Sequence, residues 1–187
     1  MEGTATVVKH TGSHYLLAQL PSWRLFPAVL RGKVRLGGSS ATNPVAVGDR
    51  VEFHADGDLL PDGSVPASET APAAITRILP RRNYIIRKSV NLSRQAHIIA
   101  ANVDHAFIVV TLAFPEVKLP FIDRLLVTCE VYGVKPVIVL NKIDIVDEFR
   151  DDFAPALENF HRIYEGAGYS ILEVSAKTGR GVDELRR

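Results

Sequence analysis

The feature that most constrains the fold is a pair of short apolar runs, each of which leads directly into a polar motif. Residues 136–140 precede the motif Asn-Lys-Ile-Asp at 141–144, and residues 171–174 precede Ser-Ala-Lys at 175–177. Continuous apolar runs of this length are typical of strands that are buried on both faces, as in a parallel sheet. Open sheets of this type bind ligands at the carboxyl ends of their strands. We therefore expect both motifs at the ligand-binding edge of an α/β unit.

From residue 105 onward, strand patterns alternate with helical ones. Residues 106–112 form a third apolar run, and 119–132 read as an amphipathic helix with an apolar stripe at i, i+3, i+4 and i+7 (Ile122, Leu125, Leu126 and Cys129). Further helices are expected at 148–166 and from about Gly181 onward. This alternation predicts a parallel α/β domain over residues 105–187.

The first 80 residues have a different pattern, with short β-branched runs separated by turn residues. Five strands are expected, at 5–10, 15–20, 25–31, 51–54 and 74–79. They suit a small β-barrel of the OB type, although an SH3-like barrel would have nearly the same pattern. Residues 60–74, rich in Pro, Ser, Gly, Ala and Thr, are expected to form a loop that buries little surface. We thus predict an all-β OB-like barrel at 1–80, a junction at 81–104 and the α/β domain at 105–187.

Asp144 is the residue with the clearest chemical implication. An ionised carboxylate only accepts hydrogen bonds, and guanine presents two adjacent donors, N1–H and its amino group, whereas adenine has no such pair. Asp144 also precedes a helical pattern, where aspartate is a good N-cap, and this is the structural alternative. The second motif, one helix and one strand later, favours base recognition.

A phosphate-binding loop of the form Gly-x-x-x-x-Gly-Lys-Ser/Thr is missing from the 140 residues before Asn141. The single Gly-Lys pair, at Gly32 and Lys33, is followed by Val34 and has Pro27 where the first glycine should stand. The sequence therefore contains base-reading motifs without an upstream phosphate-reading motif.

This order of segments resembles the circularly permuted GTPases, most closely the ribosome-small-subunit-dependent GTPase A family. The likeness extends to residues 48–51, 80–83, 100–104 and 122–125, so it covers nearly the whole chain. Taken alone, the first of these segments is a turn and the last contains an exposed Asp123-Arg124 pair on a helix, so we expect structural roles for them.

The resemblance implies a role for each motif residue. Asn141 would hold its loop and approach N7 of guanine, and the stem of Lys142 would lie over the ring. Ser175 would brace the second loop, the backbone N–H of Ala176 would meet O6, and Lys177 would cover the other side of the base. Together with Asp144, these residues form the predicted guanine site.

The resemblance also implies what lies outside these residues. In the family, the phosphate loop, the switch segments, the Mg²⁺ site and a zinc-binding tail follow the Ser-Ala-Lys motif, so we expect them beyond Arg187. The complete protein is then expected to bind GTP and GDP and to hydrolyse GTP during maturation of the small (30S) ribosomal subunit. The 187 residues alone are expected to hold no catalytic residue and to be inactive.

Two other interpretations remain open on sequence. One is an RNA- or ribosome-binding module with a degenerate nucleotide domain and no hydrolysis. The other, weaker because a β-rich domain precedes the first α/β strand, is a conventional GTPase that lacks its N-terminal part.

Binding to ribosomal RNA has to rely on a local patch, since 22 Lys and Arg residues against 21 Asp and Glu residues leave almost no net charge. In an OB-fold, the face of strands 2 and 3 is the expected nucleic-acid site. His10, Tyr15 and Trp23 would supply ring faces there, although a solvated barrel edge with Trp23 in the core is an even alternative. The cations assigned to this surface are Lys9, Arg24, Arg31, Lys33 and Arg35. A second basic run, at 81–94, is more simply a solvated linker.

Other classes of site have little support. The single cysteine, Cys129, excludes an internal disulfide, and the six histidines show no metal-ligand spacing, so we expect no metal site in these residues. We find neither a signal-like N-terminus nor an apolar run of 18 residues, and therefore expect a cytoplasmic protein without a membrane span.

Overall fold

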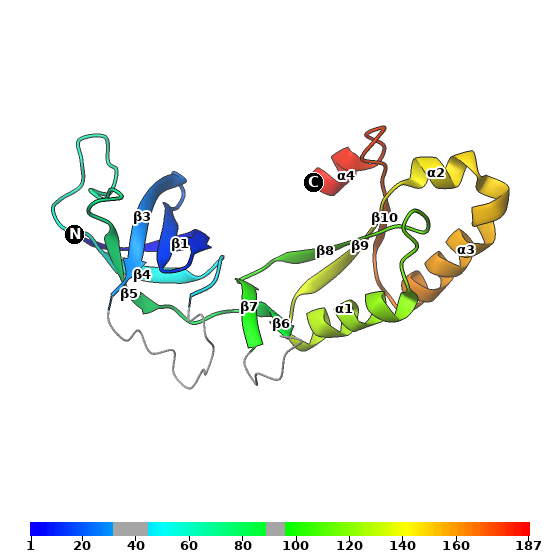
Figure 1. The fold of residues 1–187 in the computed structure, drawn as a ribbon, viewed down its shortest axis with the longest axis horizontal. Helices are drawn as coiled ribbons and strands as arrows, with labels where there is room; N and C mark the ends of the chain where they lie inside the picture. The colour runs from blue at the N-terminus through cyan, green and yellow to red at the C-terminus, as the bar shows by residue number, and fades with distance from the viewer. Residues whose placement is uncertain (32–44, 89–95) are drawn as a thin grey trace. The chain divides into compact units, whose positions relative to one another are not determined.

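The computed structural model describes residues 1–31, 45–88 and 96–187. The chain divides into two compact units, Met1–Val103 and Asp104–Arg187, each of which is described by itself (Figure 1).

Five strands of the first unit close into a barrel. They are β1 (Glu2–Thr11), β2 (His14–Gln19), β3 (Arg24–Leu30), β4 (Arg50–His54) and β5 (Ala73–Ile78), in the order β1-β2-β3-β5-β4. The β3–β5 pair is parallel and the other neighbouring strands are antiparallel. The five predicted strands are therefore confirmed to within three residues at each end, and the barrel is of the OB type.

Alternate residues of these strands fill the barrel. Val7, Leu17, Val51 and Ile75 are fully buried, and the rings of Phe26 and Phe53 pack with centroids 4.8 Å apart. Val65, in the loop between β4 and β5, also belongs to this core. The expectation that the 60–74 segment buries little surface is therefore wrong for Val65.

A buried ion pair joins the barrel to the segment that follows it. Asp49 is fully buried, and its two carboxylate oxygens accept hydrogen bonds from Nε and Nη2 of Arg81, each at 2.6 Å. The backbone N–H of Ala46 donates to Oδ2 of Asp49 at 2.8 Å. A buried carboxylate needs such partners to offset its loss of hydration. The 48–51 segment is thus more than a turn, and Arg81 is not part of a solvated linker.

Strands β6 (Tyr84–Lys88) and β7 (Ala96–Ala101), which the sequence did not predict, pair within this segment. Asn102 donates to the carbonyl of Gly48 at 2.9 Å and accepts from the backbone of Arg82 at 2.8 Å. Gly48 has a φ of +87°, and a Cβ there would overlap the carbonyl oxygen of Ala101. Residues 81–103 therefore pack as part of the barrel unit.

The second unit is a parallel α/β fold, as predicted. Strands β8 (His105–Val110), β9 (Lys135–Leu140) and β10 (Ile171–Glu173) form a parallel sheet in the order β10-β9-β8. The helices are α1 (Leu119–Val131), α2 (Ile143–Glu148), α3 (Arg150–Gly166) and α4 (Val182–Arg186) (Figure 1).

The helices differ from the prediction in one place. The expected helix at 148–166 is α3, but a separate six-residue helix, α2, begins inside the 141–144 motif and ends at Glu148. Asp123, expected as an exposed residue, accepts a 3.0 Å hydrogen bond from the hydroxyl of Tyr164, which connects α1 to α3. Burial, followed by this contact, raises the pKa of Tyr164 well above its ordinary value.

Candidate functional site

The two polar motifs lie side by side, because β9 and β10 are neighbouring parallel strands. The backbone N–H of Val174 donates to the carbonyl of Leu140 at 2.9 Å, and that of Ile143 donates to the carbonyl of Val174 at 3.1 Å. Each motif starts where its strand ends, so the sheet itself brings the two loops together.

Asn141 bonds the loops to each other. Its Oδ1 accepts the backbone N–H of Lys142 at 2.8 Å and the backbone N–H of Ala176 at 3.1 Å. The backbone N–H of Asn141 donates to the carbonyl of Val110 at the end of β8. One side chain thus fixes the relative position of both loops and of the sheet edge.

Ser175 and Asp144 form a second connection. Ser175 is fully buried, and its hydroxyl donates to Oδ1 of Asp144 at 2.6 Å while accepting the N–H of Thr178 at 3.1 Å. The other carboxylate oxygen, Oδ2, lies 3.9 Å from Nζ of Lys177, whose side chain is largely exposed. Asp144 lies within the first turn of α2, whose N-cap is Lys142 without a side-chain cap bond. The alternative role of Asp144 as an N-cap is therefore wrong.

Lys142 has a left-handed backbone conformation, with a φ of +63°, which is uncommon for a residue with a side chain. Its Nζ donates to the carbonyl of Phe114, in the loop after β8. Phe114 is exposed and also has a positive φ. Sequence reasoning missed this loop, and no motif in it would have pointed to the site.

Arg180 and Asp147 were missed as well. The guanidinium of Arg180 donates to Oδ2 of Asp147, so the loop after β10 contacts α2 at a second place. The only sequence signal was their proximity to the motifs, at three residues beyond Lys177 and Asp144.

The cations assigned to RNA have different surroundings in the barrel. Lys9 and Arg31 are exposed, and Arg24 is exposed but donates to the carbonyl of Asp62. Lys33 and Arg35 lie outside the described residues. Of the second basic run, Arg81 pairs with Asp49 and Arg82 is exposed.

The aromatic residues of this surface divide into two groups. Tyr15 is buried in the barrel core, so its assignment to an RNA-facing surface is wrong, and burial raises the pKa of its hydroxyl. Trp23 is 63% exposed in the turn between β2 and β3, so its alternative place in the core is also wrong.

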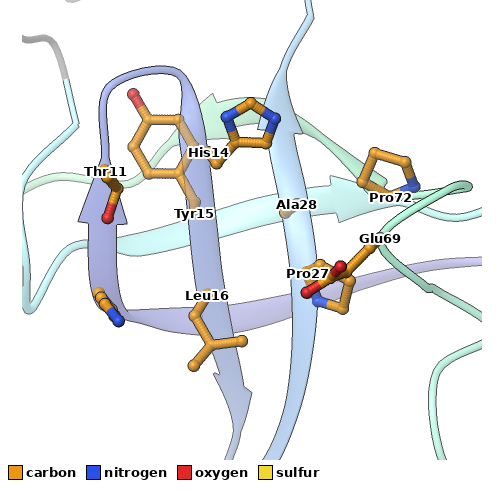
Figure 2. A pocket seen from close by; sticks show the side chains of 9 residues that line it. Thr11, His14, Tyr15, Leu16, Pro27, Ala28, Glu69 and Pro72 are labelled. Carbon is orange, nitrogen blue, oxygen red and sulfur yellow. The ribbon is translucent and has the colours of Figure 1, made fainter.

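A pocket of about 550 Å³ lies on the barrel beside Lys9 (Figure 2). His14 and Leu16 of β2, Pro27 of β3 and Glu69 of the loop before β5 contribute to its lining. Its rim carries both signs of charge, so charge alone does not assign it to an anionic ligand.

Among the described residues, no group of three or more His, Cys, Asp or Glu side chains is arranged to hold a metal ion. Within the same ranges, none of the helices has the length and apolar character needed to cross a membrane.

Known proteins similar to this chain share its order of elements. The RsgA GTPase family model matches residues 78–187. The small ribosomal subunit biogenesis GTPase RsgA of Flavobacterium psychrophilum is 40% identical over 183 residues, which are 98% of this chain and 52% of that protein. The protein of the same name from Porphyromonas gingivalis is 42% identical over 96% of this chain and 53% of its own length. The chain thus spans about half the length of the curated relatives it matches.

Two solved structures have the same fold. YjeQ from Thermotoga maritima matches with a TM-score of 0.71 and 30% identity, over all of this chain and 56% of its own. YloQ, described as a circularly permuted GTPase, matches with a TM-score of 0.64 at 20% identity, over all of this chain and 55% of its own. The similarity therefore covers both units.

Proposed function

Because the chain belongs to the RsgA GTPase family, we propose that residues 105–187 read the guanine base of GTP and GDP in a protein that hydrolyses GTP during biogenesis of the small ribosomal subunit. The observation that carries this proposal is the pair of side-chain bonds between the two loops, from Ala176 to Asn141 and from Ser175 to Asp144. These bonds organise a polar surface at the carboxyl edge of the sheet, where α/β folds bind nucleotides.

Asp144 is the proposed guanine discriminator. The hydroxyl of Ser175 fixes the orientation of its carboxylate, and the side chain remains 19% exposed toward the loop of Lys177. The carboxylate then accepts N1–H and the amino group of guanine in a bidentate pair. Adenine has no such pair of donors, so its binding would leave the carboxylate desolvated without a partner.

The other motif residues surround the base in the same proposal. Asn141 orients the loops and approaches N7, and Lys142 and Lys177 cover the two faces of the purine. Ser175 braces the second loop. The N–H of Ala176 already donates to Asn141 at 3.1 Å, so reading O6 requires a shared, three-centre hydrogen bond.

Hydrolysis needs groups that the described residues do not bring together. Phosphoryl transfer depends on a phosphate-binding loop and Mg²⁺, and no cluster of metal-binding side chains exists in the described ranges. We therefore assign base recognition to this chain and no step of the phosphoryl chemistry. Neither Mg²⁺ nor zinc is assigned to its residues.

We further propose that the barrel contacts the RNA of the small subunit in the cytoplasm. Trp23 supports this part of the proposal, because it is an exposed aromatic ring at the turn between the two strands that OB-folds use for nucleic acids. Lys9 and Arg31 are exposed cations of the same unit. Arg24 contributes charge although it also bonds to Asp62.

The substitution Asp144→Asn in the complete protein tests base recognition. Asparagine can still accept the Ser175 hydroxyl but presents an amide that suits xanthine better than guanine. We expect GDP affinity to fall by a factor on the order of 10² or more and the preference to shift toward XDP. Titration with fluorescent GDP and unlabelled competitors measures both, and Asp183→Asn on the exposed face of α4 is the control.

An unchanged affinity for GDP in Asp144→Asn would contradict base recognition. Guanine binding by the complete protein without any GTP hydrolysis would favour an RNA-binding module that has lost its catalytic function.

A further inference from the structure

Arg180 connects the two loops on the side away from Asn141. Its guanidinium donates to Oδ2 of Asp147 on α2, and Nη2 lies 3.5 Å from Oε2 of Glu173 on β10. The side chain of Arg180 is 52% exposed and that of Asp147 is 41% exposed. One cation thus contacts carboxylates from the helix that follows the first motif and from the strand that precedes the second.

The loop after β10 folds back to place Arg180 there. The N–H of Ser175 donates to the carbonyl of Arg180 at 2.9 Å, and the N–H of Gly179 donates to the carbonyl of Ser175 at 2.8 Å. Gly181 then turns the chain with a φ of +73°, and a Cβ at this position would overlap the carbonyl oxygen of Glu173. The backbone of Arg180 is therefore fixed opposite the buried Ser175.

Asp147 transmits this contact to the proposed base reader. Asp147 and Asp144 are three residues apart on α2, so holding Asp147 restrains the short helix that presents Asp144. Arg180 reaches this helix by a route separate from the hydrogen bond between Ser175 and Asp144. The loops are thus joined once beneath the base site and once beside it.

Glu173 is held from its other side by α3. Its Oε1 lies 2.9 Å from Nε2 of His161, and Nδ1 of His161 lies 3.0 Å from Glu165. Arg180 is therefore anchored to a carboxylate whose position α3 already restrains.

We propose that Arg180 is a positioning residue that slows the release of guanine nucleotide by keeping the two base-reading loops together. This inference rests on the proposed guanine site. Release of the base requires the loops to separate, and the ion pair from Arg180 to Asp147 opposes that movement. Because the pair is half-exposed, salt weakens it, and its effect on the rate is modest.

The dissociation rate of fluorescent GDP from the complete protein, measured by displacement with excess unlabelled GDP, tests this role. We expect Arg180→Ala and Asp147→Ala each to raise the rate about two- to fivefold. The double variant should release GDP no faster than either single variant, because both substitutions remove the same contact. Arg180→Lys should restore part of the wild-type rate.

The control is Arg186→Ala, which removes an exposed arginine of α4 that pairs only locally with Asp183. Its release rate should equal that of the wild type. Salt provides a second readout: raising it from about 0.05 to about 0.5 M should speed release from the wild type but not from Arg180→Ala.

Release from Arg180→Ala at the wild-type rate, with GDP still preferred over ADP, would overturn the role of Arg180. Additive effects of Arg180→Ala and Asp147→Ala, or an equal effect of Arg186→Ala, would overturn it too, since they would indicate general loosening of the fold. If the wild type fails to prefer GDP over ADP, the proposed function falls, and this inference falls with it.

Discussion

The hydroxyl of Ser175 donates a 2.6 Å hydrogen bond to the carboxylate of Asp144, across 31 residues of chain. Ser175 is fully buried, so this bond lies inside the fold and its partners cannot turn to water instead. It sets the direction in which the remaining oxygen of Asp144 points. The strength of the base site should therefore depend on a residue that need not touch the base.

Ser175→Ala should both destabilise the second unit and weaken GDP binding. It leaves one oxygen of Asp144 and the N–H of Thr178 without their partner, at a cost of about 1–3 kcal/mol. Urea unfolding and GDP titration measure the two effects. Ser170→Ala, at an exposed serine before β10, should change neither. Equal behaviour of the two variants would rule out this role of Ser175.

Arg81→Ala should strongly destabilise the barrel unit, because it leaves the fully buried carboxylate of Asp49 without its counter-charge. Breaking one partner of a buried pair costs about 3–5 kcal/mol. Arg77→Ala is the matched control, since Arg77 pairs with Glu52 on the barrel surface, and its cost should stay below about 1 kcal/mol. Similar unfolding midpoints in urea for the two variants would show that the buried pair is not important for stability.

Gly181→Ala should impair GDP binding more than Gly179→Ala. Both glycines have a positive φ, so each substitution carries a backbone cost of about 1–2 kcal/mol. Only at Gly181 does the added Cβ also meet backbone, at Glu173, whereas the position at Gly179 is open. The comparison of GDP dissociation constants thus isolates the steric effect on the loop. A larger loss for Gly179→Ala would be inconsistent with this geometry.

The stability of the second unit should depend on pH through His161. Burial opposes protonation of its ring, but the contacts with Glu165 and Glu173 outweigh burial and raise the pKa of His161 above its ordinary value. The resulting stabilisation is complete below the unfolded pKa of about 6.5 and is lost as pH rises through the folded pKa. Urea unfolding of the wild type and His161→Gln between about pH 5.5 and pH 9 should therefore show a difference that shrinks with rising pH. A constant difference would exclude a contribution from this protonation.

Trp23→Ala should weaken binding to small-subunit RNA and leave the unfolding midpoint of the barrel unit unchanged. The ring is exposed, and stacking of a base on an aromatic side chain contributes about 1–3 kcal/mol. Trp23→Phe retains a ring and should keep most of the affinity, as measured by filter binding to purified small-subunit RNA. If the alanine variant binds as tightly as the wild type, Trp23 does not stack on the RNA.

The sequence predicted those features that local patterns encode. Continuous apolar runs located β8, β9 and β10, and the polar residues that interrupt the runs located the two loops. The helix α2 was missed because six residues are too few for a periodic pattern, and because it begins inside a motif. Local spacing contains the information for strands and loops, but not for a helix shorter than two turns.

Contacts between distant residues were beyond such patterns. Strand β2 has apolar residues on both faces, so alternation could not show that Tyr15 points inward. Nothing near Asp49 indicates that its partner, Arg81, comes 32 residues later. The same holds for Arg180 and Asp147, which are separated by 33 residues and meet only because β9 and β10 are neighbours.

The contact between Gly48 and Ala101 limits how the barrel can be transplanted. A barrel excised at residue 80 would lose Arg81, Asn102 and strand β7, and with them the counter-charge of Asp49 and the backbone partner of Val47. The portable piece is therefore Met1–Val103. A gene fusion that borrows this barrel has to carry those 23 additional residues, whatever domain follows them.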